Sequence, residues 1–362
     1  MDAGKERKTH AADWPCTDRW RCGSREHGLC IYRFGRTDLS GLYVLLGRIL
    51  LCIFHSALHG WHLQNIFHIA QRPKGRAMKN LKGKVAVITG AARGIGFALA
   101  EASAEAGMKL AISDIDPAAL AEAKKSLDAK GAETLAFPAD VGNASEIEAL
   151  AAATLKQFGS ADLLFNNAGL FGTPALLWEQ ELADWEKTIS VNLMGAINGI
   201  RTFVPIMLHQ ETDCHIVNVA SVAGHLVQPF LGPYQATKFA MTAITESLYL
   251  ELQTLDANIG VSLVCPGFTK TNIMGGEAAS EPSQEEMSGG PASMIRSAMT
   301  EGVKSGLSPH DVAKQVIEAV KNDKFYVFTH PYALEMIGKR FDQVLGGTNP
   351  LLEGALKERF TE

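Results

Sequence analysis

A tyrosine and a lysine four residues apart are the pair in this sequence best suited to proton transfer. They are Tyr234 and Lys238, in the segment Tyr-Gln-Ala-Thr-Lys. On a helix this spacing places both side chains on one face. A free tyrosine has a pKa of about 10, and a nearby ammonium lowers that pKa by stabilising the phenolate. The spacing therefore indicates a tyrosine that can act as an acid and a base near neutral pH, although many helices carry such a pair on their surface.

A glycine-rich turn lies between an apolar run and a helical pattern. The turn contains Gly90, Arg93, Gly94, Ile95 and Gly96. Glycines let the backbone turn tightly, and a helix N-terminus offers free N–H groups and positive potential to an anion. The spacing is G-x-x-x-G-x-G, which differs from the general dinucleotide fingerprint G-x-G-x-x-G. Its position between a strand and a helix predicts a pyrophosphate site.

One acidic residue bears on the choice between NAD and NADP. Asp114 closes the second predicted strand, 18 residues after Gly96. An acid at that place accepts hydrogen bonds from ribose hydroxyls and repels a 2′-phosphate, which favours NAD. Arg93, within the glycine turn, can instead pair with a 2′-phosphate, so NADP stays open as the alternative.

The residues that position these groups alternate between strand and helix patterns. Short apolar runs predict strands at 85–88, 110–113, 134–137, 163–166, 215–220, 261–264 and 325–328. Helical patterns fall between them, at 95–106, 117–129, 145–158, 182–208, 234–255 and 309–322. This alternation predicts one α/β domain, a Rossmann-like doubly wound parallel sheet of about seven strands with helices on both faces. The stretch 272–293 is predicted to be an irregular loop, of the kind that often forms a lid.

Several ordered motifs together resemble the short-chain dehydrogenase/reductase family, from about residue 81 to at least residue 267. The glycine turn resembles the family's cofactor loop, and Ser221, 13 residues before Tyr234, resembles its catalytic serine. The remaining matches are Asp140 and Val141 at the adenine, Asn166-Asn167-Ala168-Gly169 beside the cofactor, Asn192 on a helix, and Pro266, Gly267, Thr269 and Thr271 in the loop over the nicotinamide. Ala220 departs from the pattern, because many members have a second serine there.

The resemblance implies a role for each of four catalytic residues. Tyr234 would move the proton of an alcohol or carbonyl oxygen, and Ser221 would hold that oxygen. Lys238 would lower the tyrosine pKa and bind the nicotinamide ribose. Asn192 would hold a water molecule that connects Lys238 to solvent. The resemblance implies NAD or NADP as the hydride carrier, a small alcohol or ketone substrate, no metal, and a homodimer or homotetramer formed through the two long helices.

The expected substrate pocket is mostly apolar. It would form from the segment after Ser221 and from the loop after Gly267, and its candidate contacts are Ser221, Tyr234, His225, Gln228 and Phe268. The closing segment 326–331 is similar to that of family members that oxidise hydrophobic or aryl secondary alcohols. These residues predict an apolar or aromatic secondary alcohol or ketone.

Residues 1–77 differ in composition from the rest of the chain. They hold 12 Lys and Arg against 6 Asp and Glu, a net charge of +6 that leaves −11 for residues 78–362. The apolar run 41–59 is long enough for a membrane segment, but Arg48 in its middle largely offsets its hydrophobicity. We expect 1–77 to be a disordered extension or to lie upstream of a translation start at Met78, with a membrane anchor at 41–59 as the alternative.

The overall composition excludes several classes of protein. A formal net charge of −5 argues against nucleic-acid binding, and a hydrophobic fraction of 46% argues against global disorder. The expected protein is a cytoplasmic enzyme that binds neither nucleic acid nor membranes. Two alternatives remain open: a non-catalytic, nucleotide-binding redox sensor on the same fold, and a membrane-anchored reductase.

Overall fold

The computed structural model describes residues 77–210, 212–273 and 291–351, all within the unit Arg72–Glu362. The predicted extension, with its apolar run 41–59, lies outside the described residues except for Ala77. Just after it, Met78 and Leu81 are buried in the hydrophobic core. The division at residue 77 therefore stays a prediction.

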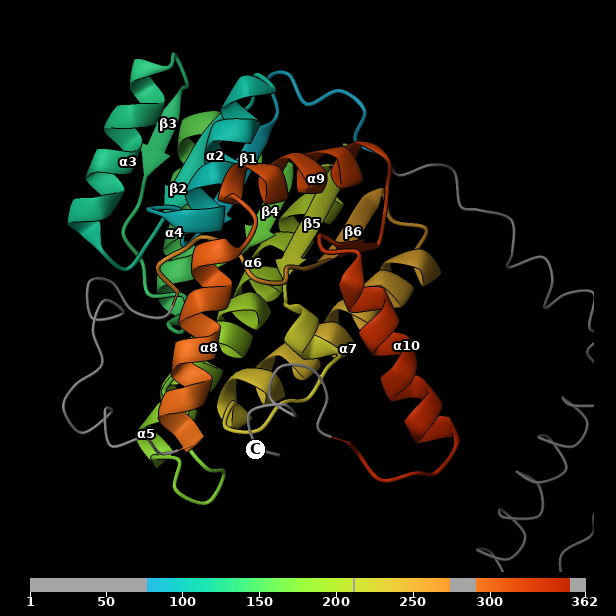
Figure 1. Ribbon diagram of the computed structural model, residues 1–362. Coiled ribbons are helices and arrows are strands. Elements are labelled where there is room, and N and C mark those ends of the chain that lie inside the picture. The colour runs from blue at the N-terminus through green and yellow to red at the C-terminus, as the bar shows by residue number, and fades with distance from the viewer. Residues whose placement is uncertain (1–76, 211, 274–290, 352–362) are drawn as a thin grey trace, which may run out of the picture. The chain divides into compact units, whose positions relative to one another are not determined.

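The centre of the fold is a seven-stranded sheet in which every pairing is parallel (Figure 1). Its spatial order is β3-β2-β1-β4-β5-β6-β7. The strands are β1 (Val85–Thr89), β2 (Lys109–Ser113), β3 (Thr134–Ala136), β4 (Leu163–Asn166), β5 (Cys214–Val219), β6 (Ile259–Cys265) and β7 (Tyr326–Phe328). The central strands are buried on both faces; the sequences of β1 and β4 are mainly apolar, whereas β5 also buries His215 and Asn218. The predicted doubly wound architecture is confirmed.

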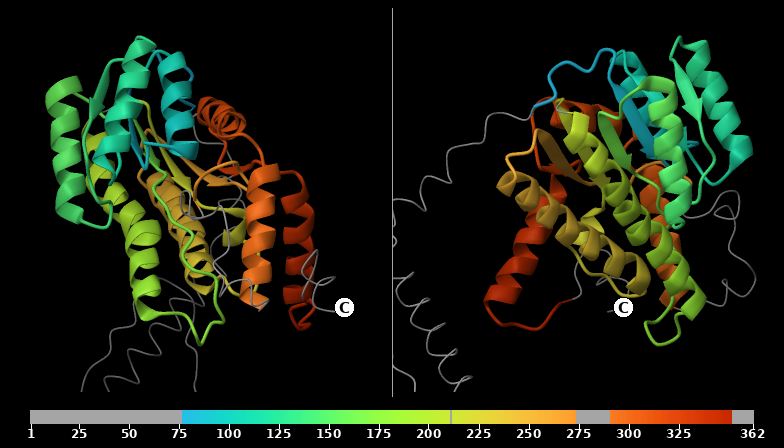
Figure 2. Two further views of the ribbon diagram at one scale, coloured as in Figure 1. Left: turned by 60° about the vertical axis from the view of Figure 1, so that its left-hand side comes forward. Right: turned by 180° about the vertical axis from the view of Figure 1, so that it is seen from behind.

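Helices cover both faces of this sheet (Figure 2). The side chains of α2 (Gly94–Glu105), α3 (Pro117–Ala129) and α9 (Pro309–Lys321) pack in one core cluster with Leu110 and Phe165. Those of α4 (Ala144–Phe158), α6 (Gly195–Gln210) and α7 (Gly232–Thr254) pack in a second cluster with Val87 and Leu164. These two apolar layers hold the carboxyl ends of the strands at one edge.

The long helix predicted at 182–208 is interrupted in its middle. It consists of α5 (Leu182–Ile189), a π-helical turn η2 (Ser190–Met194) and α6. By length and composition alone, the run Leu182–Gln210 is apolar enough to cross a membrane. Phe203 and Met207 of this run are buried in the core beside α4 and the sheet, which also accounts for its apolar composition.

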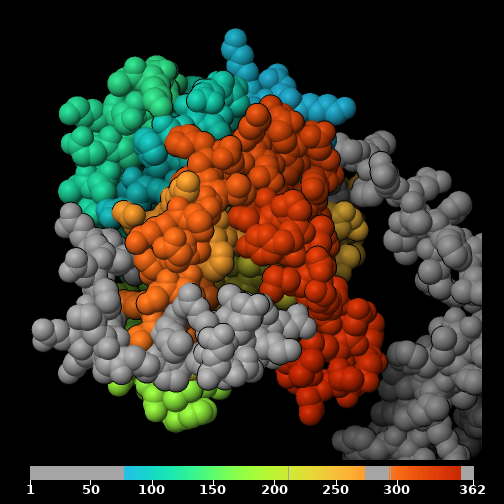
Figure 3. Space-filling view, in the orientation of Figure 1, coloured from blue at the N-terminus to red at the C-terminus, as the bar shows by residue number. Residues whose placement is uncertain are grey.

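Two helices were not predicted. They are α8 (Pro291–Ser305), which begins where the irregular loop was expected to end, and α10 (Tyr332–Leu345), which follows the last strand. The short 3-10 turn η3 (Val222–Gly224) after β5 was not predicted either. Figure 3 shows side chains of α8 and α10, in orange and red, on the face of the molecule turned toward the viewer.

Candidate active site

A cavity of about 760 Å³ opens at the carboxyl ends of the parallel strands. It is lined by residues that follow β1, β2, β4, β5 and β6, and by residues of α7, α8 and α10. Ligands of open α/β sheets bind at this edge. Of the residues predicted to lie beside the cofactor, all but Asn166 line this one cavity.

The glycine turn is shaped by close contacts between backbones. Gly90 and Gly94 have φ angles of +63° and +58°, which favour glycine. A Cβ on Gly96 would come within 2.0 Å of the Gly90 carbonyl oxygen, so only glycine fits there. Within the described residues no side chain caps the N-terminus of α2, and its first turn carries no acid. The free N–H groups of α2 therefore suit an anion such as a pyrophosphate.

Asp114 lies at the rim of the cavity, where β2 ends. Its two carboxylate oxygens accept hydrogen bonds from the backbone N–H groups of Ala92, at 3.0 Å, and Asp116, at 3.1 Å. These bonds fix the carboxylate between the glycine turn and the start of α3. Arg93 forms an ion pair with Asp116, which also caps α3 through the N–H groups of Ala118 and Ala119. Both Arg93 and Asp114 line the cavity, but the arginine is already paired with a carboxylate.

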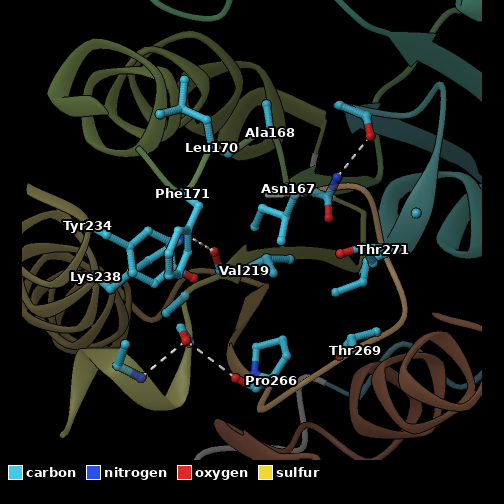
Figure 4. A pocket seen from close by; sticks show the side chains of 18 of the residues that line it. Asn167, Ala168, Leu170, Phe171, Val219, Tyr234, Lys238, Pro266, Thr269 and Thr271 are labelled. Carbon is cyan, nitrogen blue, oxygen red and sulfur yellow. Dashed lines mark hydrogen bonds between the residues drawn. The ribbon is translucent and has the colours of Figure 1, made fainter. Parts of the chain in front are cut away.

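The asparagine motif after β4 joins two neighbouring strand ends. The Asn167 side chain donates hydrogen bonds to the carbonyl oxygens of Thr89, at 2.9 Å, and Gly90, at 3.1 Å (Figure 4). A Cβ on Gly90 would lie 2.8 Å from the Ala168 Cα, so the two turns touch. Gly169 continues this wall of the cavity.

The turn after β3 is held in a similar way. The Asp140 carboxylate accepts from the Gly142 N–H at 2.9 Å, and Asn198 of α6 donates to the Val141 carbonyl at 2.9 Å. Both Asp140 and Val141 line the cavity. They therefore line the same cavity as Asp114, and their contact with the adenine stays a prediction.

Tyr234 and Ser221 meet at the centre of the cavity. Tyr234 lies in the first turn of α7. Ser221 is the second residue after β5, next to Ala220. Both side chains are buried. The Ser221 hydroxyl lies close enough to the Tyr234 hydroxyl to lower the pKa of the phenol. The ring of Phe171 packs against the ring of Tyr234, with centroids 4.9 Å apart (Figure 4). A substrate oxygen at this point would face both hydroxyl groups.

Lys238 lies one turn along α7 from Tyr234 and is 3% exposed. Its Nζ donates a hydrogen bond to the Val219 carbonyl at 3.0 Å and lies 5.6 Å from the centre of the Tyr234 ring. A Cβ on Gly169 would be 3.7 Å from this Nζ. The ammonium group is therefore the cation beside both the tyrosine and the cofactor wall.

Asn192 does not line the cavity but lies behind it, in the π-helical turn. Its amide accepts from the Leu170 N–H at 2.8 Å and donates to the Leu170 carbonyl at 2.9 Å. It also donates to the Thr237 hydroxyl at 3.2 Å. In this geometry Asn192 is a positioning residue that joins the turn after β4 to α7; the predicted water relay stays a prediction.

Burial shifts the pKa values of the tyrosine and the lysine in opposite directions. It raises the pKa of Tyr234, and the hydrogen bond from Ser221 opposes this only in part. It lowers the pKa of Lys238 to about 8. Burial thus dominates the pKa of the phenol, and the lowering of that pKa by Lys238 stays a prediction. At neutral pH the site holds a protonated phenol.

The loop after β6 forms another wall of the cavity. Pro266, Gly267, Thr269 and Thr271 line the cavity, as predicted. Thr271 approaches the glycine turn, since a Cβ on Gly94 would lie 3.2 Å from its methyl group. The loop after β6 thus closes over the cavity from the side facing the glycine turn.

The substrate contacts predicted from the sequence are only partly brought together. Gln228 and Phe268 line the cavity with Ser221 and Tyr234, but His225 does not. The turn η3 directs the His225 side chain away, so that its Nε2 lies 3.4 Å from the Cys265 sulfur and its ring packs against Phe328. The lining residues that were not singled out from the sequence include Phe171, Val303, Tyr332 and Met336. The spacing of Tyr332 and Met336, four residues apart just after a strand end, was the available signal.

This geometry agrees with the comparisons with known proteins. The family described as short chain dehydrogenase matches residues 84–282. The chain belongs to the short-chain dehydrogenase/reductase family. It is an oxidoreductase of the type that acts on CH–OH groups with a nicotinamide cofactor. The glycine turn, Ser221, Tyr234 and Lys238 all fall within the matched residues.

The relatives of this short-chain dehydrogenase/reductase span several named activities. A CLA biosynthesis dehydrogenase/reductase of Lactiplantibacillus plantarum is 35% identical over 274 residues, which cover 74% of this chain and 95% of that protein. The structure of a short-chain dehydrogenase/reductase from Burkholderia phymatum, solved in complex with NAD, is 40% identical and has a TM-score of 0.71. The match covers 77% of this chain and 100% of the Burkholderia chain. An alcohol dehydrogenase of Thermococcus sibiricus, solved with 5-hydroxy-NADP, is 27% identical and has a TM-score of 0.56. The match covers 68% of this chain and 95% of the Thermococcus chain. Related structures thus hold either type of dinucleotide.

Proposed function

We propose that this enzyme uses NAD to interconvert an apolar or aryl secondary alcohol and its ketone. The observation that carries the proposal is the lining of the cavity around and beyond Tyr234. Beyond Ser221, Tyr234 and Lys238, its polar side chains are uncharged: Gln228, Gln235, Asn272 and the phenol of Tyr332. Its apolar members are mainly Phe171, Ala223, Leu226, Leu231, Phe268, Ile273, Met299, Val303 and Met336. Such a surface favours a neutral, apolar ligand, because a charged group there would lose its water without gaining a partner.

The charged groups that line the cavity are accounted for elsewhere. Arg93, Asp114 and Asp140 stand in the cofactor motifs, and Lys238 is held by the Val219 carbonyl. Lys187 of α5 lies one turn before Val191, which packs in the same cluster as Val141. A substrate carboxylate would have none of these as a dedicated partner near Tyr234.

The residues of the chain supply proton transfer and orientation. In reduction, the Tyr234 phenol donates its proton to the carbonyl oxygen as negative charge develops there, and Ser221 donates a hydrogen bond to the same oxygen. In oxidation, the phenolate removes the proton of the alcohol. The bound nicotinamide supplies or accepts the hydride at the carbon. A Lys238 ammonium beside the phenol stabilises the negative charge that develops on the phenolate oxygen.

A paired set of substrates tests this proposal. The full chain would be assayed with 1-phenylethanol and with mandelate, which carries a carboxylate on the same aryl alcohol, each with NAD and with NADP. We expect turnover of 1-phenylethanol and little or none of mandelate. A preference for mandelate would refute the apolar assignment. No turnover across a wider alcohol and ketone panel, together with tight NAD binding, would favour a redox sensor.

The position of Asp114 predicts how cofactor choice can be changed. Asp114→Asn removes the negative charge at the rim, so we expect the NAD-to-NADP ratio of kcat/KM to fall about tenfold. The control is Asp128→Asn, which removes a carboxylate paired with Lys124 on the exposed side of α3. An unchanged ratio in Asp114→Asn would show that this carboxylate does not set the choice.

We also propose that the enzyme is a homo-oligomer that uses the surface of α5, α6 and α7. Large apolar side chains are exposed there, at Leu182, Ile189, Met194 and Leu208 on the first run and Leu250 on α7. Apolar side chains gathered on neighbouring helices are typical of subunit contacts. Light scattering on the wild type and on Leu250→Arg tests this: we expect a dimer or tetramer that Leu250→Arg weakens, and a wild-type monomer would refute it.

A further inference from the structure

His330, two residues beyond the end of β7, joins both sides of one peptide unit in the loop after β6. Its Nδ1 lies 3.0 Å from the Gly267 nitrogen, which donates to it. Its Nε2 lies 3.0 Å from the Phe268 carbonyl oxygen. The residue is 8% exposed, so water does not readily replace either contact. Neither contact was anticipated from the sequence.

These two contacts fix the protonation of the ring. Because Gly267 offers an N–H group, Nδ1 must be an acceptor. The ring proton then stands on Nε2 and is donated to the Phe268 carbonyl. Only the neutral imidazole with its proton on Nε2 satisfies both groups. The Thr329 hydroxyl, 2.8 Å from Nδ1, can donate to the same nitrogen.

The Phe268 carbonyl is a junction for three segments. It also accepts a hydrogen bond from the Leu307 N–H at 2.9 Å, between α8 and α9. The Phe268 ring lies against α8, where a Cβ on Gly302 would come within 2.8 Å of its carbon atoms. A change at this carbonyl would therefore reach α8, which supplies Met299 and Val303 to the cavity.

We propose that His330 is a positioning residue that holds the loop 266–269 in its cofactor-binding shape, and that it does so only as a neutral imidazole. A second proton on the ring would turn Nδ1 into a donor that faces the Gly267 N–H group. One hydrogen bond would be lost and two N–H groups would oppose each other. The loop that carries Gly267 and Thr269 would then move away from the cavity.

The surroundings of His330 favour the neutral ring. Burial lowers the pKa of His330, and the hydrogen bond to the Phe268 carbonyl opposes this only in part. Its titratable neighbour is Tyr332, whose ring centroid lies 5.4 Å away and whose pKa burial raises. The charged groups Glu335 and Lys339 of α10 pair with each other. In the described part of the chain, no carboxylate forms an ion pair with His330.

Three substitutions separate the two contacts. In His330→Asn the amide oxygen replaces Nδ1 and can accept from Gly267, and in His330→Gln the amide nitrogen replaces Nε2 and can donate to Phe268. His330→Phe keeps a ring and neither contact. Each hydrogen bond lost is expected to lower the affinity for NADH about fivefold. We therefore expect NADH to bind about 5 times more weakly to the Asn and Gln variants and about 25 times more weakly to His330→Phe.

The measurement is titration of the full chain with NADH, followed by nicotinamide fluorescence between pH 5.5 and 8, and it needs no substrate. We expect wild-type affinity to fall toward acid pH, as the pH approaches the pKa of His330, which burial holds below the ordinary 6.5. The Asn and Gln variants, which cannot titrate, should lose this dependence. His209→Asn, on the exposed end of α6, is the control that should keep it.

The proposal rests on the cofactor site but not on the proposed substrate. Wild-type affinity for NADH in His330→Phe at pH 8 would overturn it. So would an acid dependence that persists in both amide variants. A wild type that binds neither NADH nor NADPH would overturn the cofactor site itself, whereas failure of the alcohol panel alone would leave the proposal standing. Melting temperatures of all variants at pH 8 show whether weak binding reflects lost folding.

Discussion

Replacing Tyr234 by phenylalanine is expected to remove turnover of any substrate while leaving cofactor binding close to that of the wild type. The phenol is the group that faces a substrate oxygen together with Ser221, and it is buried, so water cannot easily take its place. General acid–base catalysis contributes about 10²- to 10⁴-fold, and we expect a loss in that range for both reaction directions. The ring of phenylalanine fills the same space against Phe171.

A matched control stands on the same helix. Tyr249 also belongs to α7, but its ring packs against Phe325 and it is not one of the residues that line the cavity. Tyr249→Phe should keep its activity, which separates loss of the catalytic hydroxyl from a general effect of this substitution on α7. Activity close to the wild type in Tyr234→Phe would remove Tyr234 from the mechanism.

The sheet and the cofactor wall could be predicted because their signals are local. The strand Val85–Thr89 is a continuous apolar run, and such a run fits the buried centre of a parallel sheet. Only glycine fits at position 96, because a Cβ there would clash with the Gly90 carbonyl oxygen. The residue type itself therefore indicates the close approach of the two backbone segments. Once the strands are parallel, their carboxyl ends meet at one edge, and the motifs after them must come together.

The substrate side of the cavity depends on side-chain direction, which local patterns do not give. His225 lies four residues after Ser221, but the turn η3 directs its ring to Cys265 and Phe328. Conversely, Tyr332 and Met336 reach the cavity from α10, far away in the sequence. The role of His330 depends on a loop 63 residues earlier in the chain, a contact that no spacing within one motif reveals.

The electrostatics of the site were also only partly predictable. The four-residue spacing of Tyr234 and Lys238 correctly placed both on one helix, but it carried no information on burial. The structure buries both side chains, and burial determines the direction of each pKa.

Replacing Lys238 by methionine is expected to lower alcohol oxidation about a hundredfold at pH 8, the effect of removing a cation that favours the phenolate. Part of the loss should be recovered at higher pH, where the phenolate forms without help. Reduction, which uses the protonated phenol, should lose less. The rate-against-pH profiles of both directions measure this difference, and Lys314→Met, an exposed position on α9, is the control.

Whereas Lys238→Met is expected to lower oxidation activity, it is expected to leave the stability of the fold unchanged or to raise it. This difference separates the role of Lys238 in catalysis from a role in folding. The pKa of Lys238 is about 8 in the folded protein against 10.5 ordinarily, so below pH 8 the fold must hold a buried ammonium at a cost. Between these two values the unfolded chain binds the extra proton, and wild-type stability rises with pH. Lys238→Met should lack this rise and melt at or above the wild-type temperature at pH 7. A contrary result would be a lower melting temperature in Lys238→Met, together with a loss of oxidation activity that is the same at every pH. That result would show that Lys238 acts mainly by packing against the Val219 strand end.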